Sequence, residues 1–337
     1  MINIKEYTNI DYIFSVSEAD TLIDIFSDIK ISPYDNYQSF ENNINEILNA
    51  DIIPKRFIDF CGEAKLLKKH EKPCITLKGC PIDKDLPLLD YTNPVVDKRY
   101  KKKTYVSESF LLIYAKLMEQ EPIGYLNVND GDIFQDIHPW EKLANTQSQK
   151  ALEDIGFHKD LANHFVRPDW VNILGLRQAE TNYVFTSFTR NIDVLEELSS
   201  SQRKILAKNL FYTPFDDLSI AGGNVELGDA DLHPIIGGAS EYDIRIFENR
   251  TIGLTPEAQQ AVYAIIKLLH KHKKRFRIKS GFFLGEANNE SVHAKEVIHF
   301  EDKDDLRNRW LQKTVNVADL RQHAKFFQKN SKNLVNG

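Results

Sequence analysis

The chain has 337 residues, of which 42% are hydrophobic and 11% aromatic, so it can bury a large core. A formal net charge of −6 argues against a nucleic-acid-binding protein, because phosphate contacts require a clustered basic surface. No apolar stretch approaches membrane-spanning length, and the first residues lack the pattern of a secretory signal. The three cysteines have no paired spacing, which favours reduced thiols. We therefore expect a cytoplasmic protein with neither a nucleic-acid nor a membrane partner.

Apolar residues recur with helical spacing in the first third of the chain. This spacing predicts helices over residues 17–30, 38–50 and 107–121, with Ser17 or Ser39 as an N-cap. We expect residues 1–120 to form a mostly helical layer.

From about residue 121 the chain changes to short β-rich segments separated by turn residues. These predicted strands are 123–128, 170–176, 182–189, 242–247, 275–285 and 311–317. Two predicted helices, 191–210 and 255–272, interrupt them. Many short strands with few helices favour a sandwich or barrel. Because neither a repeat nor a linker divides the sequence, we expect one domain spanning 1–337, with its β core in 121–320.

The segment 219–241 is long, acidic and rich in glycine. A loop of this length inside a compact domain is usually functional and often closes over a site. We therefore expect a lid here, with an irregular surface excursion as the alternative.

The stretch "GFHKDLANHFVRPDW" contains the first candidate for a metal site. His158 and Asp160 are two residues apart, so on a strand both side chains would point to the same face. With His293 as a third ligand, they would give the two-histidine, one-carboxylate arrangement of non-haem Fe(II) oxygenases. The tripeptide alone is more typical of an ordinary polar patch. Arg309 changes this balance, because it lies sixteen residues after His293 and could hold an anionic cosubstrate through a bidentate contact.

Several longer stretches resemble the Fe(II)/2-oxoglutarate-dependent oxygenases of the clavaminate synthase-like group, particularly the hydroxylases of free basic amino acids. The similarity runs from about residue 121 to 317. It is carried by "FHKDLANHFVRPDWVNILGLR", "YDIRIFENRTIGLTPEAQQAV", "NNESVHAK" and "NRWLQK". This resemblance implies an α+β protein with a mainly β core, a double-stranded β-helix or jelly roll with flanking helices.

The resemblance also implies roles for individual residues. It assigns Fe(II) to His158, Asp160 and His293. It assigns 2-oxoglutarate to Arg309 and Thr186, and the amino-acid substrate's head group to Asn127, Ser148 and Lys313. The sequence departs from the family at three positions: many relatives have glutamate in place of Asp160, aspartate in place of Asn308 and arginine in place of Lys313.

The implied reaction consumes O2 and 2-oxoglutarate, releases succinate and CO2, and hydroxylates a free amino acid. The carboxylate of Asp160 favours hydroxylation over halogenation, because related halogenases place a small residue there. We expect a basic substrate, L-lysine (at C3 or C4) first and L-arginine second. Asp243 is the expected partner of its side-chain cation.

Two other classes stay open at this point. One is a cupin-type metalloenzyme that does not use 2-oxoglutarate, and the other is a non-catalytic jelly-roll binding module. A homo-oligomer is possible, and the partner expected is a small molecule.

Overall fold

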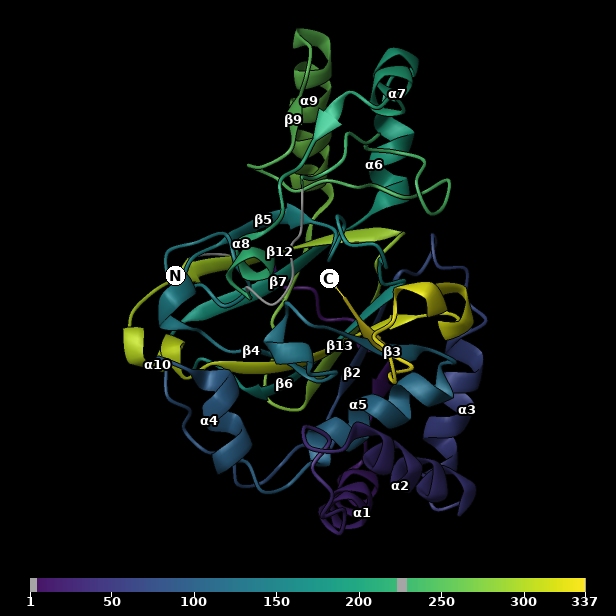
Figure 1. Cartoon of the computed structure of the whole chain (residues 1–337), viewed down its shortest axis with the longest axis vertical. Coiled ribbons are helices and arrows are strands. Elements are labelled where there is room, and N and C mark those ends of the chain that lie inside the picture. Colours follow the sequence, from purple (N-terminus) through teal and green to yellow (C-terminus); the bar gives the residue numbers. More distant parts are fainter. Residues whose placement is uncertain (1–4, 223–228, 337) are drawn as a thin grey trace.

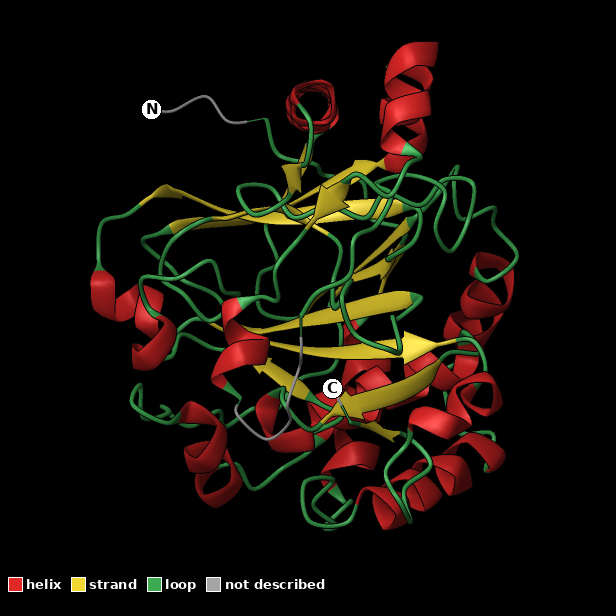
Figure 2. Cartoon of the chain, turned by 45° about the horizontal axis from the view of Figure 1, so that its top comes forward, coloured by secondary structure: helices red, strands yellow, loops and turns green. Residues whose placement is uncertain are grey.

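The computed structural model describes residues 5–222 and 229–336. Two β-sheets lie one above the other at the centre of the molecule, and helices cover their outer sides (Figures 1 and 2). The larger sheet has the strand order β1-β2-β11-β6-β13-β3-β14, with β4 also paired to β13. The smaller sheet has the order β10-β7-β12-β5, and β8 pairs with β9 separately.

The strands of the larger sheet are β1 (Tyr12–Ile13), β2 (Cys74–Lys78), β3 (Glu121–Tyr125), β4 (Gln135–Ile137), β6 (Trp170–Arg177), β11 (Phe282–Ala287), β13 (Trp310–Val317) and β14 (Leu334–Val335). Those of the smaller sheet are β5 (Ile155–His158), β7 (Tyr183–Arg190), β10 (Lys274–Phe276) and β12 (Ser291–His299). The separate pair is β8 (Phe211–Tyr212) and β9 (Ile252–Gly253).

The N-terminal helices cover the outer face of the larger sheet. They are α1 (Val16–Ser27), α2 (Tyr37–Asn49), α3 (Lys55–Ala64), α4 (Pro94–Lys101) and α5 (Val106–Leu117). Helix α5 is buried along nearly its whole length, because α1, α2 and α3 pack on one side of it and the sheet on the other. The first part of the chain thus forms these helices and also contributes strands β1 and β2 to the larger sheet.

Two details of this layer differ from the sequence-based expectation. Helix α1 is capped by Ser15 and not by Ser17, because Ser15 and Glu18 form a reciprocal capping box. Helix α2 is capped by Asn36 and not by Ser39; the Asn36 side chain accepts a hydrogen bond from the backbone N–H of Ser39.

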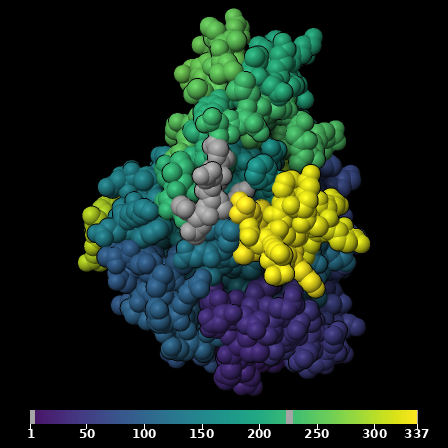
Figure 3. All heavy atoms as spheres, in the orientation of Figure 1, coloured from purple at the N-terminus to yellow at the C-terminus, as the bar shows by residue number. Residues whose placement is uncertain are grey.

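The remaining helices belong to the second half of the chain. They are α6 (Asn191–Glu197), α7 (Ser200–Leu206), α8 (Asp217–Ala221), α9 (Pro256–His272) and α10 (Lys303–Arg307). Short 3-10 turns occur at η1 (Asn129–Gly131), η2 (Glu141–Leu143) and η3 (Leu320–Phe326). The helices α7 and α9 form the projection at the top of the molecule in Figures 1 and 3.

Three segments depart from the predicted elements. The single helix expected over 191–210 is wrong: it breaks into α6 and α7, because Ser199 and Gln202 form a new capping box. The strand expected over 242–247 makes only isolated bridges, from Ile244 and Phe247. The segment 275–285 contributes to two different sheets, because the chain turns between them at Gly281 with a positive φ of 72°.

The structure is thus a mixed α/β protein with a large sheet, a smaller facing sheet and flanking helices. Among the described residues, no helix combines the length and hydrophobicity needed to span a bilayer. All three cysteines are buried and unpaired, as expected for free thiols.

Candidate active site

The three predicted metal ligands meet between the two sheets. His158 ends β5, Asp160 lies two residues beyond it, and His293 is the third residue of β12. Strands β5 and β12 are antiparallel neighbours, and their register places His293 directly opposite His158. One ligand atom from each of the three side chains lies within 4.8 Å of the other two. The sequence had placed His293 after a strand; the structure places it inside one, which fixes the direction of its ring.

Both imidazoles direct the same ring nitrogen towards the carboxylate. The Nε2 atoms of His158 and His293 lie 3.4 and 3.6 Å from Oδ1 of Asp160. In His158, Nδ1 lies 2.9 Å from the carbonyl oxygen of Gly156, a contact that places the proton on Nδ1 and leaves the Nε2 lone pair free. Two imidazole nitrogens and a carboxylate oxygen are suitable ligands for Fe(II), so the donor set fits the expected ion.

His293 has a second carboxylate behind it that the sequence did not predict. Glu286 of β11 is fully buried, and its Oε2 lies 3.1 Å from Nδ1 of His293. Burial opposes the charged form of His293, but the carboxylates of Glu286 and Asp160 outweigh it and raise its pKa to about 10. A carboxylate behind a ligating histidine holds the ring in orientation and increases its basicity.

Asp160 is held by its backbone and by its side chain. Its N–H donates to the side chain of Asn288 at 3.1 Å, and Asn288 donates back to the Asp160 carbonyl at 3.2 Å. Lys313 of β13 donates to Oδ2 of Asp160 at 2.7 Å. Burial alone would raise the pKa of Asp160, but the nearby charge of Lys313 helps to keep this pKa well below its usual range. Lys313, expected at the substrate's α-carboxylate, therefore contacts the metal-ligand carboxylate in this structure.

A cavity beside the triad contains both residues expected at the cosubstrate. Arg309, just before β13, and Thr186 of β7 line it together with the three metal ligands. Arg309 is buried, and no described residue forms a hydrogen bond or ion pair with its guanidinium. Burial, and after it the neighbouring charge of Arg277, lowers the pKa of Arg309 to about 10. A buried guanidinium without a partner is costly unless an anion binds it, so this end of the cavity fits a carboxylate.

Lys295 is a second cation in the same cavity, and the sequence reasoning missed it. It lies two residues after His293 on β12 and directly opposite Thr186 of β7. Its Nζ donates to the carbonyl of Ala151 at 2.6 Å. Burial, followed by the charge of Arg309, lowers the pKa of Lys295 to about 7. Period-two spacing from His293 was the signal that could have identified it.

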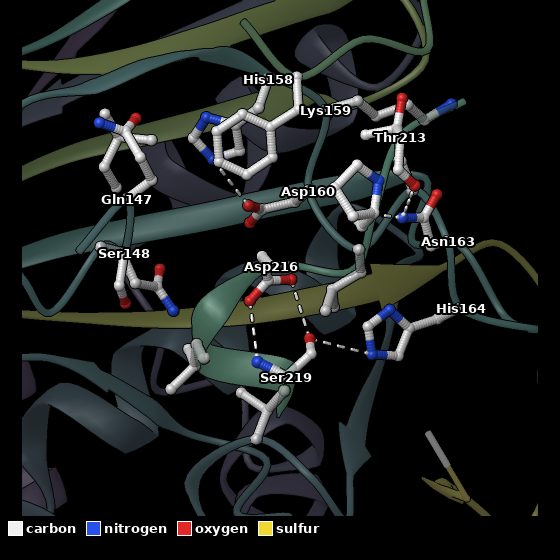
Figure 4. A pocket seen from close by; sticks show the side chains of 18 of the residues that line it. Gln147, Ser148, His158, Lys159, Asp160, Asn163, His164, Thr213, Asp216 and Ser219 are labelled. Carbon is white, nitrogen blue, oxygen red and sulfur yellow. Dashed lines mark hydrogen bonds and ion pairs between the residues drawn. The ribbon is translucent and has the colours of Figure 1, made fainter. Parts of the chain in front are cut away.

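A second, larger cavity shares His158, Asp160 and Lys313 with the first (Figure 4). Ser148, expected to hold the substrate's head group, lines this cavity. Asn127 does not line it: its amide lies behind the cavity wall, 3.3 Å from Nε2 of His164. Asp216, which the sequence reasoning did not consider, points into the cavity and accepts hydrogen bonds from the backbone and hydroxyl of Ser219.

Asp243, expected at the substrate's side chain, is not available in this structure. Its carboxylate is buried and forms an ion pair with Nζ of Lys159 at 2.6 Å, and it does not line the larger cavity. The sequence placed Asp243 at the start of a strand, but the segment makes only isolated bridges, and its direction is set by Lys159 instead.

The expected lid lies only partly within the described residues. Helix α8 stands at its start, and Leu218 and Ser219 of this helix line the larger cavity. Residues 223–228 of the segment lie outside the described part of the chain.

Comparison with known proteins supports the class that this geometry indicates. No family model matches the chain. An L-asparagine oxygenase of Streptomyces coelicolor is 26% identical over 250 residues, covering 74% of this chain and 72% of the relative. A solved structure of asparagine oxygenase with Fe(II), 2S,3S-3-hydroxyasparagine and succinate has a TM-score of 0.82 at 20% identity and covers 97% of this chain and 99% of its own.

The non-haem iron oxygenase OrfP, solved with Fe, succinate and (3S)-hydroxy-L-Arg, has a TM-score of 0.77 at 20% identity. It covers 96% of this chain and 99% of its own. The chain therefore has the fold of these non-haem iron oxygenases, and its His158–Asp160–His293 cluster provides ligands that fit Fe(II). More particularly, the relative and the two structures support the resemblance to the clavaminate synthase-like Fe(II)/2-oxoglutarate-dependent oxygenases.

Proposed function

We propose that this protein hydroxylates a free L-amino acid, using Fe(II), 2-oxoglutarate and O2. The observation that carries the proposal is the position of Arg309, buried and without a side-chain partner among the described residues, in a cavity that the His158–Asp160–His293 cluster also lines. This combination provides a metal position and an anion position in one enclosure. A metalloenzyme that does not use 2-oxoglutarate would have no need of the anion position. A non-catalytic binding module would need neither the metal position nor the anion position.

The bound iron would supply the oxidative chemistry. 2-Oxoglutarate is oxidised to succinate and CO2, one atom of O2 enters the succinate, and the other enters a C–H bond of the amino acid as hydroxyl. The chain supplies positions for these reactants. Arg309 would hold the distal carboxylate of 2-oxoglutarate as a charge-assisted pair, and the Thr186 hydroxyl would lie alongside it. Burial of this cavity excludes water from the reacting groups.

The larger cavity would hold the amino acid. Ser148 lines it near the triad, and Asp216 offers a carboxylate that can receive an ammonium group. Lys313 lines both cavities and donates to Asp160 at 2.7 Å, so its ammonium group would be available to an α-carboxylate bound beside the metal position. Asn127 would affect substrate binding only indirectly, through the contact of its amide with His164.

The choice of substrate within this class needs a separate argument. L-Lysine and, second, L-arginine were expected because a basic side chain could pair with Asp243. Because Lys159 already pairs with Asp243, that carboxylate gives no reason to prefer a basic substrate. The OrfP structure, however, contains a hydroxylated arginine, so at least one related protein binds a basic amino acid.

We also propose the double-stranded β-helix as the architecture of the core. The two facing sheets and the high structural similarity to asparagine oxygenase support it. The whole chain would then be a single oxygenase domain.

A panel assay tests the function. The purified protein is incubated with Fe(II), 2-oxoglutarate and each free amino acid, and products are measured by mass spectrometry. The proposal predicts a gain of one oxygen atom in at least one amino acid, with succinate formed in equal amount. The absence of such a product from every free amino acid would contradict it.

A further inference from the structure

Lys159 is a buried cation at the edge of the larger cavity, between two metal ligands in sequence. Its Nζ donates to Oδ1 of Asp243 and to Oδ1 of Asn289, both at 2.6 Å. The side chains of Lys159 and Asp243 are 0% and 1% exposed, so this ion pair is shielded from water. The other oxygen of Asp243 accepts the backbone N–H of Ala239 at 2.8 Å.

We infer that the substrate is a free amino acid with an uncharged side chain, and that Lys159 excludes lysine and arginine by occupying the carboxylate that would receive their cations. This inference rests on the proposed function and adds the substrate class to it. In this arrangement the protein's own ammonium group takes the place of a substrate ammonium.

The charges that line the larger cavity lead to the same conclusion. Among the described residues lining it, only Asp160 and Asp216 carry carboxylates. Asp160 serves as a metal ligand and contacts Lys313. Asp216 forms no ion pair with any described residue, so it can receive the α-ammonium group of a substrate.

Besides Lys313, a second cation is present for the substrate's α-carboxylate. Arg245 lines the cavity and donates from one Nη to the side chain of Asn163 at 2.8 Å. Its Nε is buried, with no hydrogen-bond partner among the described residues. Asp216 and Arg245 together therefore match one ammonium and one carboxylate. A further ammonium or guanidinium on the side chain would be buried without a counter-charge, which is costly.

Apart from the charged residues named above and Lys313, the described lining consists of uncharged residues and histidines. Phe247 stacks on the His158 ring, with ring centroids 5.0 Å apart, and Ile246 precedes it in the cavity wall. Groups able to form hydrogen bonds also line it: Gln135, Gln147, Ser148, Gln149, Asn163, His164, Thr213 and Ser219. Such a lining suits an apolar or amide side chain and offers no anion to a cationic one.

The test compares the Fe(II) holoenzyme on neutral and cationic substrates. Arginine and citrulline form a matched pair, because they have nearly the same shape and differ in side-chain charge; lysine is compared with glutamine, asparagine and leucine. We expect kcat/KM for the best neutral amino acid to exceed that for lysine and arginine by at least about 100-fold, since a buried unpaired polar group gives strong discrimination. Anaerobic calorimetry with Mn(II) and 2-oxoglutarate should give the same order of binding.

Preferred hydroxylation of lysine or arginine would overturn the inference while leaving the proposed function intact. Failure to hydroxylate any free amino acid would overturn the proposed function and the inference with it. The two failures are therefore distinguishable in a single panel.

The variant Lys159→Met tests the role of that residue. Removing its ammonium frees the Asp243 carboxylate, so the ratio of lysine to neutral turnover should rise at least about tenfold, and the double variant Lys159→Met/Asp243→Asn should reverse the rise. An unchanged ratio in a folded Lys159→Met protein would overturn the role of Lys159. If the variant does not fold, the wild-type panel still decides the substrate class.

Discussion

His293 on β12 lies directly opposite His158 on β5, and this register brings two imidazoles from positions 135 residues apart to one carboxylate. The two ring centroids are 4.5 Å apart, with the planes inclined by 64°. Because the smaller sheet fixes both backbones, strand pairing sets the positions of the two imidazoles, whereas Asp160, in the turn after β5, is held by Asn288.

Removal of Asp160 should greatly weaken metal binding at this position. The variant Asp160→Ala leaves two imidazoles and no anionic ligand, so its affinity for Fe(II) should fall by more than the 10–100-fold typical of changes behind the ligands. Anaerobic calorimetry with Fe(II) or Mn(II) measures this metal affinity. Asp24→Ala, an exposed change on α1, is the control and should bind normally. Equal affinity in the two variants would contradict the assignment.

Glu286 should orient His293 without touching the metal. Glu286→Gln keeps the size of the side chain but removes its charge, so metal affinity should fall by about 10–100-fold. Glu46→Gln, exposed on α2, is the matched control. If Glu286→Gln changed only the thermal stability and left metal affinity unaltered, the residue would be structural alone.

Arg309 should govern the requirement for 2-oxoglutarate. Truncating a buried charge pair costs about 2–5 kcal/mol, so Arg309→Ala should raise the apparent KM for 2-oxoglutarate by at least about 30-fold. Arg307→Ala, two residues earlier and half-exposed, serves as the control. Unchanged 2-oxoglutarate dependence in Arg309→Ala would count against the whole cosubstrate cavity.

Lys295 should also contribute to the binding of 2-oxoglutarate. Because hydrogen bonds to charged groups contribute about 1.5–3 kcal/mol, Lys295→Met should raise the KM for 2-oxoglutarate by roughly 10–150-fold while leaving Fe(II) affinity close to normal. The exposed change Lys303→Met should have no effect on either quantity. A loss of metal affinity without a change in 2-oxoglutarate KM would show that Lys295 only supports the strand.

The sequence predicted best those features that depend on local spacing. The pair His158 and Asp160 was predicted from period two along a strand, although β5 ends at His158 and Asp160 lies in the turn beyond it. The order of His293 and Arg309 along the chain completed the predicted site. The same periodicity could have identified Lys295. The N-terminal helices and α9 likewise follow from their apolar spacing, with N-terminal boundaries shifted by one residue, while α1 and α5 end three and four residues earlier than predicted.

What the sequence could not predict depends on contacts between distant segments. Glu286 reaches His293 from the opposite sheet, so no pattern around His293 signals it. The pairing of Lys159 with Asp243 spans 84 residues and removes the carboxylate on which the basic-substrate expectation rested. A residue's type and local position indicated that Asp243 could bind a cation, but only the fold shows which cation it meets.

The most direct test of the central claim is isotope tracing with 18O2. The holoenzyme is supplied with Fe(II), 2-oxoglutarate, 18O2 and an amino acid that it turns over, and both products are analysed by mass spectrometry. The account predicts one labelled oxygen in the new hydroxyl group and one in succinate, in equal amounts, and no label in either product with Asp160→Ala. Turnover without 2-oxoglutarate, or a hydroxyl oxygen derived wholly from water, would contradict it.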